Sequence, residues 1–163
     1  MSSPAQAHAT PEPRWRKRAK ARPEEILEAA LLEFTASGFD GARMEDIAKR
    51  AGISKAAVYL YFPSKLAVLK ALVEAKVSPI AQHARAIAAA GAADPITTLR
   101  TLAFEVASRL SDAKTIGVPQ IVLSVAGRFP EIADHYRMHV VDVARRAITL
   151  LVKAGIANRV LRN

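Results

Sequence analysis

The residues with the clearest chemical character lie together in the run GISKAAVYLYFPSK, from Gly52 to Lys65. Two lysines flank Tyr59 and Tyr61 on what the sequence indicates is a short helix. Ammonium groups bind phosphates or guanine edges, and a tyrosine can stack on a base or donate to a phosphate. Core packing is the plainer explanation for Phe62 and for part of Tyr61. The run therefore predicts a surface that meets a polyanion.

The distribution of charge supports that prediction. The 163-residue chain has a formal net charge of +9. Residues 1–22 hold six basic residues against one acidic, whereas residues 23–77 are close to neutral. Residues 1–22 are rich in small residues and proline, so a disordered basic arm is expected there. A solubilising tail is the alternative to a nucleic-acid contact. The arm residues expected to reach nucleic acid are Arg16, Lys17, Arg18 and Lys20.

The rest of the chain is predicted to be all-α. Apolar residues recur at helical spacing from Pro23, and Gly38 is expected to end the first helix. Serines at 54 and 64 are expected to cap two short helices, and no segment alternates as a strand. The prediction is three short helices followed by four or five longer ones, the last running from Pro130 to about Gly155.

Residues 44–63 fit a helix-turn-helix. Ala48 is small where two helices would cross closely, and Gly52 stands at the turn, where a left-handed backbone conformation is needed. Ile53 and Val58 would bury the second helix. This spacing indicates DNA binding, although tight helix pairs without that function also occur. With Val58 pointing inward, the opposite face of the second helix would enter the major groove.

From Pro23 to about Ala75 the chain resembles the DNA-binding domain of the TetR family of transcriptional regulators. The resemblance rests on ILEAALLEFTASGFDGARMEDIAKRAGISKAAVYLYFPSKLAVLKALV, above all on AGISKAAVYLYFPSK. GRFPEIADHYRMHVV resembles, more loosely, a segment of the regulatory domain of many members. The resemblance implies a DNA-binding domain over residues 23–77 and a helical ligand-binding and dimerisation domain over 78–163.

The family's roles transfer by position. Lys55, Ala56 and Tyr59 match base-facing positions, and Ala57, Tyr61 and Lys65 match positions that usually face phosphates. Two departures stand out. Ala42 and Arg43 occupy the place where a capping Thr or Ser is frequent, and Ala57 stands where Thr is common. The complete predicted DNA-binding set outside the arm is Arg43, Ser54, Lys55, Ala56, Ala57, Tyr59, Tyr61 and Lys65.

The resemblance also implies a sensor. Residues 78–163 would bind a small apolar or amphipathic ligand and pair two subunits as a homodimer on a palindromic operator of double-stranded DNA. The ligand would favour a dimer state that no longer fits the operator, so the protein would act as a repressor released by its ligand. The candidate ligand-binding residues carry rings or polar groups: Phe104, Arg109, Gln120, Phe129, His135, Tyr136 and His139.

Metal binding and catalysis are not expected. His135 and His139 have the i, i+4 spacing that can place two imidazoles on one metal ion, but no third ligand stands nearby in the sequence. No cofactor is therefore predicted. The sequence shows no nucleophile–base signature and no glycine-rich phosphate loop, which argues against an enzyme.

The predicted location is the cytoplasm. The chain has no cysteine, which fits a reducing compartment. No apolar run reaches the roughly 18 residues that span a bilayer, and the N-terminus lacks the apolar stretch of a signal peptide, so no membrane contact is expected.

Two questions stay open at this stage. The family normally ends with two long helices that pair subunits, and at least one is expected to be missing after about Gly155. The alternative function is a non-sensing DNA-associated protein, whose C-terminal half only forms oligomers.

Overall fold

The computed structural model describes residues 14–162, and the side chains of residues 23–162 apart from Leu110, Ala113 and Lys114. Within those residues every regular element is a helix, which confirms the all-α prediction. In chain order the elements are α1 (Arg14–Gly41), α2 (Met44–Arg50), α3 (Lys55–Tyr61), α4 (Lys65–Leu72), η1 (Val73–Val77), α5 (Ser78–Ala90), α6 (Pro95–Leu110), α7 (Ala113–Val125), α8 (Pro130–Tyr136), η2 (Arg137–Val141) and α9 (Asp142–Ala157). The two elements labelled η are π-helical turns.

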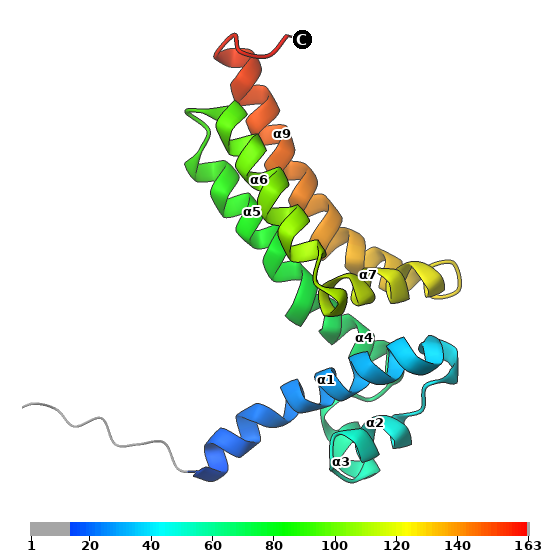
Figure 1. Cartoon of the computed structure of the whole chain (residues 1–163). Helices are drawn as coiled ribbons and strands as arrows, with labels where there is room; N and C mark the ends of the chain where they lie inside the picture. Colours follow the sequence, from blue (N-terminus) through cyan, green and yellow to red (C-terminus); the bar gives the residue numbers. More distant parts are fainter. Residues whose placement is uncertain (1–13, 163) are drawn as a thin grey trace, which may run out of the picture.

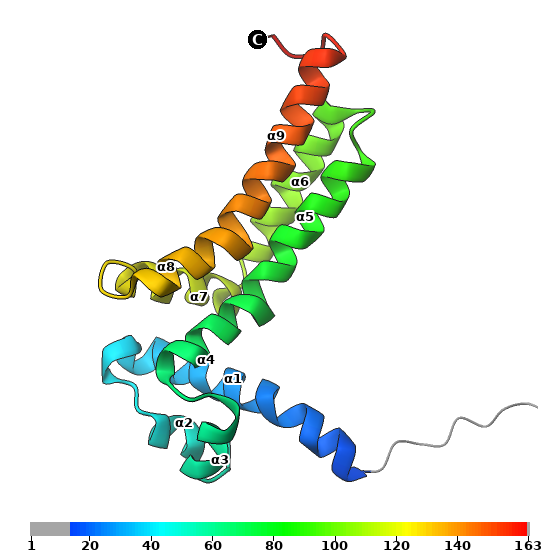
Figure 2. The ribbon, with the colours of Figure 1, turned by 180° about the vertical axis from the view of Figure 1, so that it is seen from behind.

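The helices form two ends joined by one continuous rod. Helices α1, α2 and α3 lie together at one end, and α5, α6 and α9 form a long three-helix bundle at the other (Figure 1). Helices α7 and α8 lie between the two ends (Figure 2). The rod is α4, η1 and α5 in succession, so the chain passes from one end to the other without a loop.

Helix α1 begins earlier than the sequence pattern predicts. Its backbone is helical from Arg14, so residues 14–22 are not the disordered segment predicted for them. Alanine, arginine and lysine are strong helix formers, and they outweigh the break expected at Pro23. Gly38 has φ 68°, which confirms that it ends the regular part of the helix.

The first core joins parts of the chain that the domain prediction separated. Buried residues of α1 to α4, including Phe34 and Leu69, pack with buried residues of α7 and α8, including Val122 and Ile132. Helices α7 and α8 therefore share a hydrophobic core with the helix-turn-helix end. The boundary at residues 77 and 78 falls inside the continuous rod and does not divide two cores.

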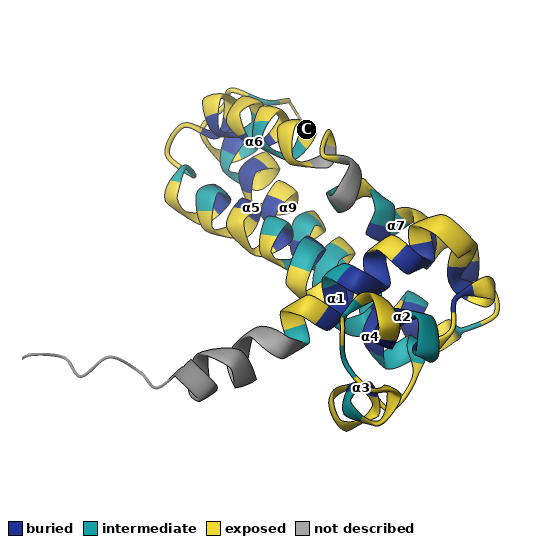
Figure 3. Ribbon diagram, turned by 60° about the horizontal axis from the view of Figure 1, so that its bottom comes forward, coloured by how far each residue is buried: buried dark blue, intermediate teal, exposed yellow. Residues whose placement is uncertain are grey.

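The second core holds the long bundle together and is small. Its buried residues are Ala84, Ala88, Leu102, Ala147 and Leu151, from α5, α6 and α9. Buried residues of the bundle form narrow stripes between exposed faces, while α1 and α4 are buried more broadly (Figure 3). The bundle is thus held by few buried side chains, three of them alanines.

Helix α9 ends at Ala157, beyond the expected stop at Gly155. Gly155 is buried inside the helix, and a Cβ there would lie 2.6 Å from Cδ1 of Leu161, which folds back over it. The turn that allows this fold has Arg159 at φ 59° and a hydrogen bond from the Val160 N–H to the Gly155 carbonyl. The glycine serves close packing, not helix termination.

Among the described residues, no single helix has both the length and the apolar character to cross a bilayer. The bent pair formed by Lys55–Tyr61 and Lys65–Ala90 reaches those values only jointly, across an angle of 57°.

Candidate functional site

The turn between α2 and α3 is fixed by glycine. Gly52 has φ 67°, a conformation that costs free energy for any residue with a Cβ. Its N–H donates to the carbonyl of Lys49 at 3.1 Å, and the N–H of Ile53 donates to the carbonyl of Ala48 at 3.1 Å. This pair of bonds is a Schellman motif, and it ends α2 while aiming the chain into α3.

One side of α3 is anchored and the other is free. Val58 is fully buried, and Phe62 packs against the first core, as the sequence predicted. Lys55, Ala56 and Leu60 are exposed. The two tyrosines are part-covered: Tyr59 is 43% exposed and Tyr61 37%. Short α3 therefore presents two aromatic rings, two small residues and one ammonium on the side away from Val58.

Ser54 caps α3. Its Oγ accepts a hydrogen bond from the Ala57 N–H at 3.1 Å, which confirms the predicted N-cap. The hydroxyl proton remains available to donate outward. The backbone N–H of Ala57, a position predicted to face a phosphate, is occupied by this cap.

Lys55 is held by an acidic neighbour. Its ammonium forms an ion pair with Glu45 of α2 and lies 5.9 Å from the centroid of the Tyr59 ring. The hydrogen bond between them raises the pKa of Lys55 and lowers the pKa of Glu45. About half of each side chain is exposed, and exposed pairs of this kind contribute little to stability. A phosphate or base can therefore exchange for Glu45 at small cost.

The predicted phosphate contact of Lys65 is not supported by its geometry. Its Nζ donates to the carbonyls of Phe39 at 2.6 Å, Asp40 at 3.1 Å and Ala42 at 2.8 Å. An ammonium has three protons, so all three are committed to the end of α1 and the loop that follows. Lys65 ties the start of α4 to that loop, which local sequence could not show because the acceptors lie 23 to 26 residues away.

Arg43 stands at the start of α2 without capping it. Its side chain is exposed and makes no cap hydrogen bond, as the departure from the family pattern predicted. It shares with Tyr59, Lys65 and Phe129 the lining of an open groove of about 500 Å³. Arg16, Lys17, Arg18 and Lys20 have a helical backbone within α1, and their side chains lie outside the described residues.

The long bundle contains an apolar opening whose lining residues the sequence did not predict. It measures about 470 Å³. Its lining comes from three helices, α5, α6 and α9: Ala84, Leu99, Leu102, Ala103, Val106, Ala107, Ala144, Ala147 and Ile148. None of the seven predicted ligand-binding residues is in this set. The sequence did contain one signal for this opening, the many alanines of these helices. Their small side chains leave open space between the helices that larger side chains would occupy.

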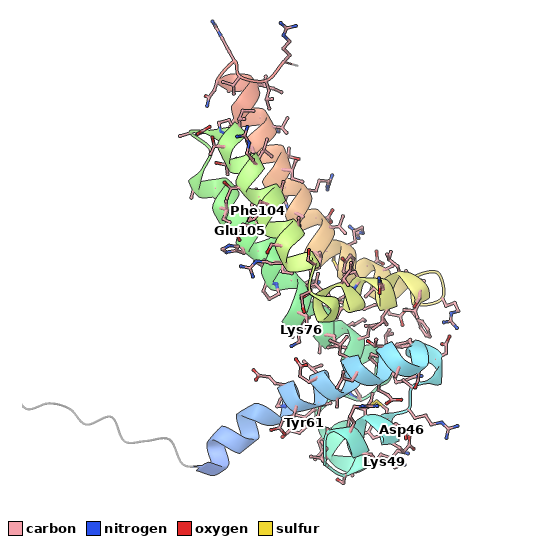
Figure 4. The ribbon with its side chains drawn as sticks, in the orientation of Figure 1. Asp46, Lys49, Tyr61, Lys76, Phe104 and Glu105 are labelled. Carbon is pink, nitrogen blue, oxygen red and sulfur yellow. The ribbon has the colours of Figure 1, made fainter. Side chains whose placement is uncertain are left out.

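The seven predicted ligand-binding residues are dispersed. Phe104 is 77% exposed on the outer face of α6 (Figure 4). Arg109, also on α6, lies 3.8 Å from Glu105 and forms an ion pair with it. Gln120 is exposed on α7. These three positions belong to the surface, not to a shared pocket.

Two of the aromatic candidates belong to the first core. Phe129 packs edge-on against Phe39, with ring centroids 5.6 Å apart. Tyr136 is partly buried against the same core, and burial raises its pKa. Both rings stabilise the contact between α8 and the helix-turn-helix end.

His135 and His139 do lie together, and a third group joins them. Their ring centroids are 4.2 Å apart, and Nε2 of His135 lies 3.2 Å from Oε1 of Glu74. Burial, followed by the charge of His139, lowers the pKa of His135, whereas Glu74 opposes the shift. No third ligand is near these histidines in the sequence, but η1 brings Glu74 to the pair from 61 residues earlier in the chain.

Three ion pairs connect elements in ways the sequence did not reveal. Arg50 of α2 binds Glu33 of α1 at 3.0 Å, and Lys76 of η1 binds Glu28 of α1. Arg128, just after α7, binds Asp40 at 2.6 Å and lowers the pKa of that carboxyl. The last pair spans 88 residues and links the α7–α8 turn to the end of α1.

Comparison with known proteins identifies the helix-turn-helix end. The family model for bacterial regulatory proteins of the tetR family matches residues 26–72. The HTH-type transcriptional regulator RutR of Escherichia coli K12 is 42% identical over 64 residues. That match covers 37% of this chain and 30% of RutR, so less than a third of that regulator's length is represented.

Two solved structures extend the likeness to the whole fold. A protein of Mesorhizobium loti described as a TetR-family transcriptional regulator matches with a TM-score of 0.71 at 23% identity, over 88% of this chain and 72% of its own. The TetR-family regulator PfmR of Thermus thermophilus matches with a TM-score of 0.58 at 26% identity, over 85% of this chain and 74% of its own. The predicted helix-turn-helix, residues 44–63, lies inside the matched segment, so this end of the molecule carries a helix-turn-helix of the tetR type.

Proposed function

We propose that this protein is a sequence-specific DNA-binding transcriptional regulator of the cytoplasm, a repressor that a small apolar molecule releases from a palindromic operator. Its role is non-catalytic. The proposal rests most directly on the outer face of α3, where Lys55, Ala56 and Tyr59 stand clear of the core while Val58 anchors the helix.

The shape of α3 suits a major groove. Ala56 and Ala57 are small, so the helix can approach base edges closely, and a thymine methyl can contact them. Lys55 reaches a guanine edge or phosphate once Glu45 is displaced, and Tyr59 stacks or donates beside it. Arg43 and Tyr61 flank the helix as candidate phosphate contacts. Lys65 is left out of this set because its protons hold three backbone carbonyls.

The operator would be read by two copies. One α3 covers only a few base pairs, and a two-fold dimer places its second recognition helix about 34 Å away, one turn of DNA further on. Apolar side chains exposed along η2 and α9, among them Met138, Val141 and Val152, offer a surface for the second copy. The length of the palindrome follows from the spacing that this dimer sets.

Release would begin in the apolar opening of the long bundle. A ligand filling about 470 Å³ between α5, α6 and α9 would press on α5, and α5 continues directly through η1 into α4 of the helix-turn-helix end. A ligand that binds one position of this rod more tightly than another shifts the protein toward that position. The change in the free energy of operator binding cannot exceed this preference, and it is typically about 1–3 kcal/mol.

The test of DNA binding starts from selection on random DNA. The selected sequence should be palindromic, and Lys55→Ala and Tyr59→Ala should each weaken its binding by about 1–3 kcal/mol, roughly 5- to 150-fold. Lys153→Ala and Phe104→Ala are the controls, because they remove a lysine and an aromatic ring from exposed positions in the distant bundle. Equal losses in the controls, or no selected sequence, would reject the proposal.

The salt dependence of DNA binding tests the role of the basic arm, residues 1–22. Removing residues 1–20 deletes five of the six basic residues of that segment. If these residues meet phosphates, the slope of log affinity against log salt should become shallower by about 0.9 for each phosphate that is no longer neutralised. An unchanged slope would mean that the arm does not bind DNA.

The sensor half separates this proposal from a non-sensing DNA-associated protein. An environment-sensitive apolar dye should bind the wild-type bundle, and Ala144→Leu, which fills the opening, should weaken that binding about tenfold, the loss expected when a buried apolar contact surface is blocked. Ala86→Leu adds the same side chain at an exposed site of α5 outside the lining and should not weaken it. No dye binding in the wild type would favour the non-sensing alternative.

A further inference from the structure

We propose that Glu74, His135 and His139 form a binding site for a divalent first-row transition metal, such as Zn²⁺, that ties the rod to the regulatory helices. One potential ligand atom from each of the three residues lies within 4.8 Å of the others. Two imidazole nitrogens and one carboxylate oxygen are a donor set that zinc accepts, with a fourth position left for water or an exogenous ligand.

The tautomer of His139 is already set for metal binding. Its Nδ1 lies 2.9 Å from the carbonyl oxygen of His135. A carbonyl only accepts hydrogen bonds, so Nδ1 carries the proton and the lone pair of the neutral ring resides on Nε2. Metal-binding histidines are commonly oriented in this way, by a hydrogen bond from the second ring nitrogen.

His135 supplies the second observation. Its Nε2 is buried and has no hydrogen-bond partner, although Oε1 of Glu74 lies 3.2 Å away. Nε2 is thus held against a carboxylate without a well-formed hydrogen bond, while the ring also meets the backbone of Lys70 of α4 and the positive charge of that lysine. A metal ion between Nε2 and the carboxylate would satisfy both groups.

The ligand atoms, which lie within 4.8 Å of one another, must still draw closer to bind one ion. Bonds of about 2.0–2.1 Å to a tetrahedral ion place ligand atoms roughly 3.3 Å apart. His135 and Glu74 already have nearly this separation. The side chain of Glu74 is 57% exposed, so it can change rotamer without disturbing the core.

The position of the three ligands suits a regulatory role. Glu74 lies in η1 and His139 in η2, the two π-helical turns of the described chain, and π-helical turns frequently mark functional positions. An ion there would join η1, where the rod leaves the helix-turn-helix end, to α8 and η2. If the proposed function is correct, metal occupancy would shift operator affinity, and this consequence rests on that function while the site itself does not.

Titration of tag-free protein with ZnCl₂, followed by calorimetry, tests the site without DNA. The wild type should bind a single ion per chain, and Glu74→Gln and His139→Ala should each weaken binding by about tenfold or more. His83→Ala is the matched control, because His83 pairs with Glu105 at 3.4 Å on the surface of the bundle and should leave the affinity almost unchanged. Circular dichroism establishes that each variant is folded, and Glu74→Gln changes an exposed side chain.

Three results would overturn the site: no saturable binding at millimolar zinc, binding unaffected by the Glu74 and His139 changes, or equal weakening by His83→Ala. The first would leave a His–His–Glu contact that binds no metal. Affinity for the selected operator, measured with and without zinc, then tests the regulatory consequence. Zinc binding through these ligands with no change in DNA affinity would keep the site and remove that consequence.

Discussion

The two hydrophobic cores of this molecule are built from different side chains. The first core is built from residues of α1 to α4, α7 and α8. It includes large side chains that are almost fully buried, such as Phe34, Ile47 and Leu69. The second core joins three helices with three alanines and two leucines. The first core leaves little freedom to the helix-turn-helix end. The second leaves an apolar opening along its side.

The contrast separates two tasks. A helix that must enter a groove needs a fixed position, and dense packing of large side chains fixes it. A site that must admit a ligand needs unfilled apolar volume, and alanines on neighbouring helices supply it. Stability is thus expected to be concentrated at the helix-turn-helix end.

The sharpest test of this comparison is the same substitution in each core. Leu69→Ala, in the first core, should lower the free energy of unfolding by about 3–5 kcal/mol, because the surroundings cannot collapse onto the cavity. Leu102→Ala should cost about 2 kcal/mol, since its side chain borders space that is already open. Urea denaturation of both variants gives the two values. Equal costs would remove the proposed difference in packing.

Lys65 tests how the edge of the first core is held. Lys65→Met should lower the free energy of unfolding by about 2–3 kcal/mol, since three carbonyls lose a charged donor. Lys153→Met, at an exposed position of α9, should change it by less than about 0.5 kcal/mol. Thermal denaturation measures both. A Lys65→Met protein of unchanged stability but weakened DNA binding would restore the phosphate role inferred from the family pattern.

The ion pair between Arg50 and Glu33 predicts a pH dependence confined to the same end. Hydrogen bonds from Arg50, then from Ser37, lower the pKa of Glu33 from 4.5. Its contribution is therefore complete above pH 4.5 and is lost as the pH falls through the lower, folded-state pKa. Arg50→Met should cost about 1–2 kcal/mol near neutral pH, and this cost should shrink as the solution is made acidic enough to protonate Glu33.

Lys49→Met is the matched control for that pH series. Lys49 lies 3.7 Å from Asp46 and its side chain is 81% exposed, so its loss should change stability by less than about 0.5 kcal/mol. Urea denaturation between about pH 3 and about pH 7 gives both curves. A cost of Arg50→Met that stays constant across this range would contradict the assignment to Glu33.

The smallest predicted effect lies at the end of the second core. Arg159 has φ 59°, a conformation that costs a non-glycine residue roughly 1–2 kcal/mol. Arg159→Gly removes that strain but increases the entropy of the unfolded chain, so a net gain of about 0.5 kcal/mol is expected. Arg162→Gly should give no gain. Thermal denaturation compares the two variants, and a loss of stability in Arg159→Gly would show that the arginine side chain supports the turn.

Local signals in the sequence were sufficient for the local structure. Gly38 and Gly52 adopt positive φ where turns were predicted, and Ser54 and Ser64 cap the helices that follow them. Val58 is buried by the same periodicity that exposes Lys55 and Tyr59. Each of these features depends on residues within a few positions of one another, so the sequence alone is enough to predict it.

Features made by distant residues could not be predicted in this way. Lys65 has the type and position of a phosphate ligand, and only the fold shows that its acceptors are at residues 39–42. Glu74 reaches His135 because α8 packs beside the rod. The ligand-binding prediction favoured rings and charges, but the opening is defined by small residues, whose effect depends on which helices face each other.

The π-helical turn η1 has a consequence for the rotational phase of the molecule. A π turn holds one residue more than the α-helical ladder around it, and one residue corresponds to about 100° of rotation about the helix axis. The buried stripe of α5, formed by Ala81, Ala84 and Ala88, faces its partners because the π turn takes up that extra residue. If the same five residues of Val73–Val77 formed a regular α-helix, this stripe would turn by about 100° away from α6 and α9. The angular register between the helix-turn-helix end and the long bundle therefore depends on the π turn.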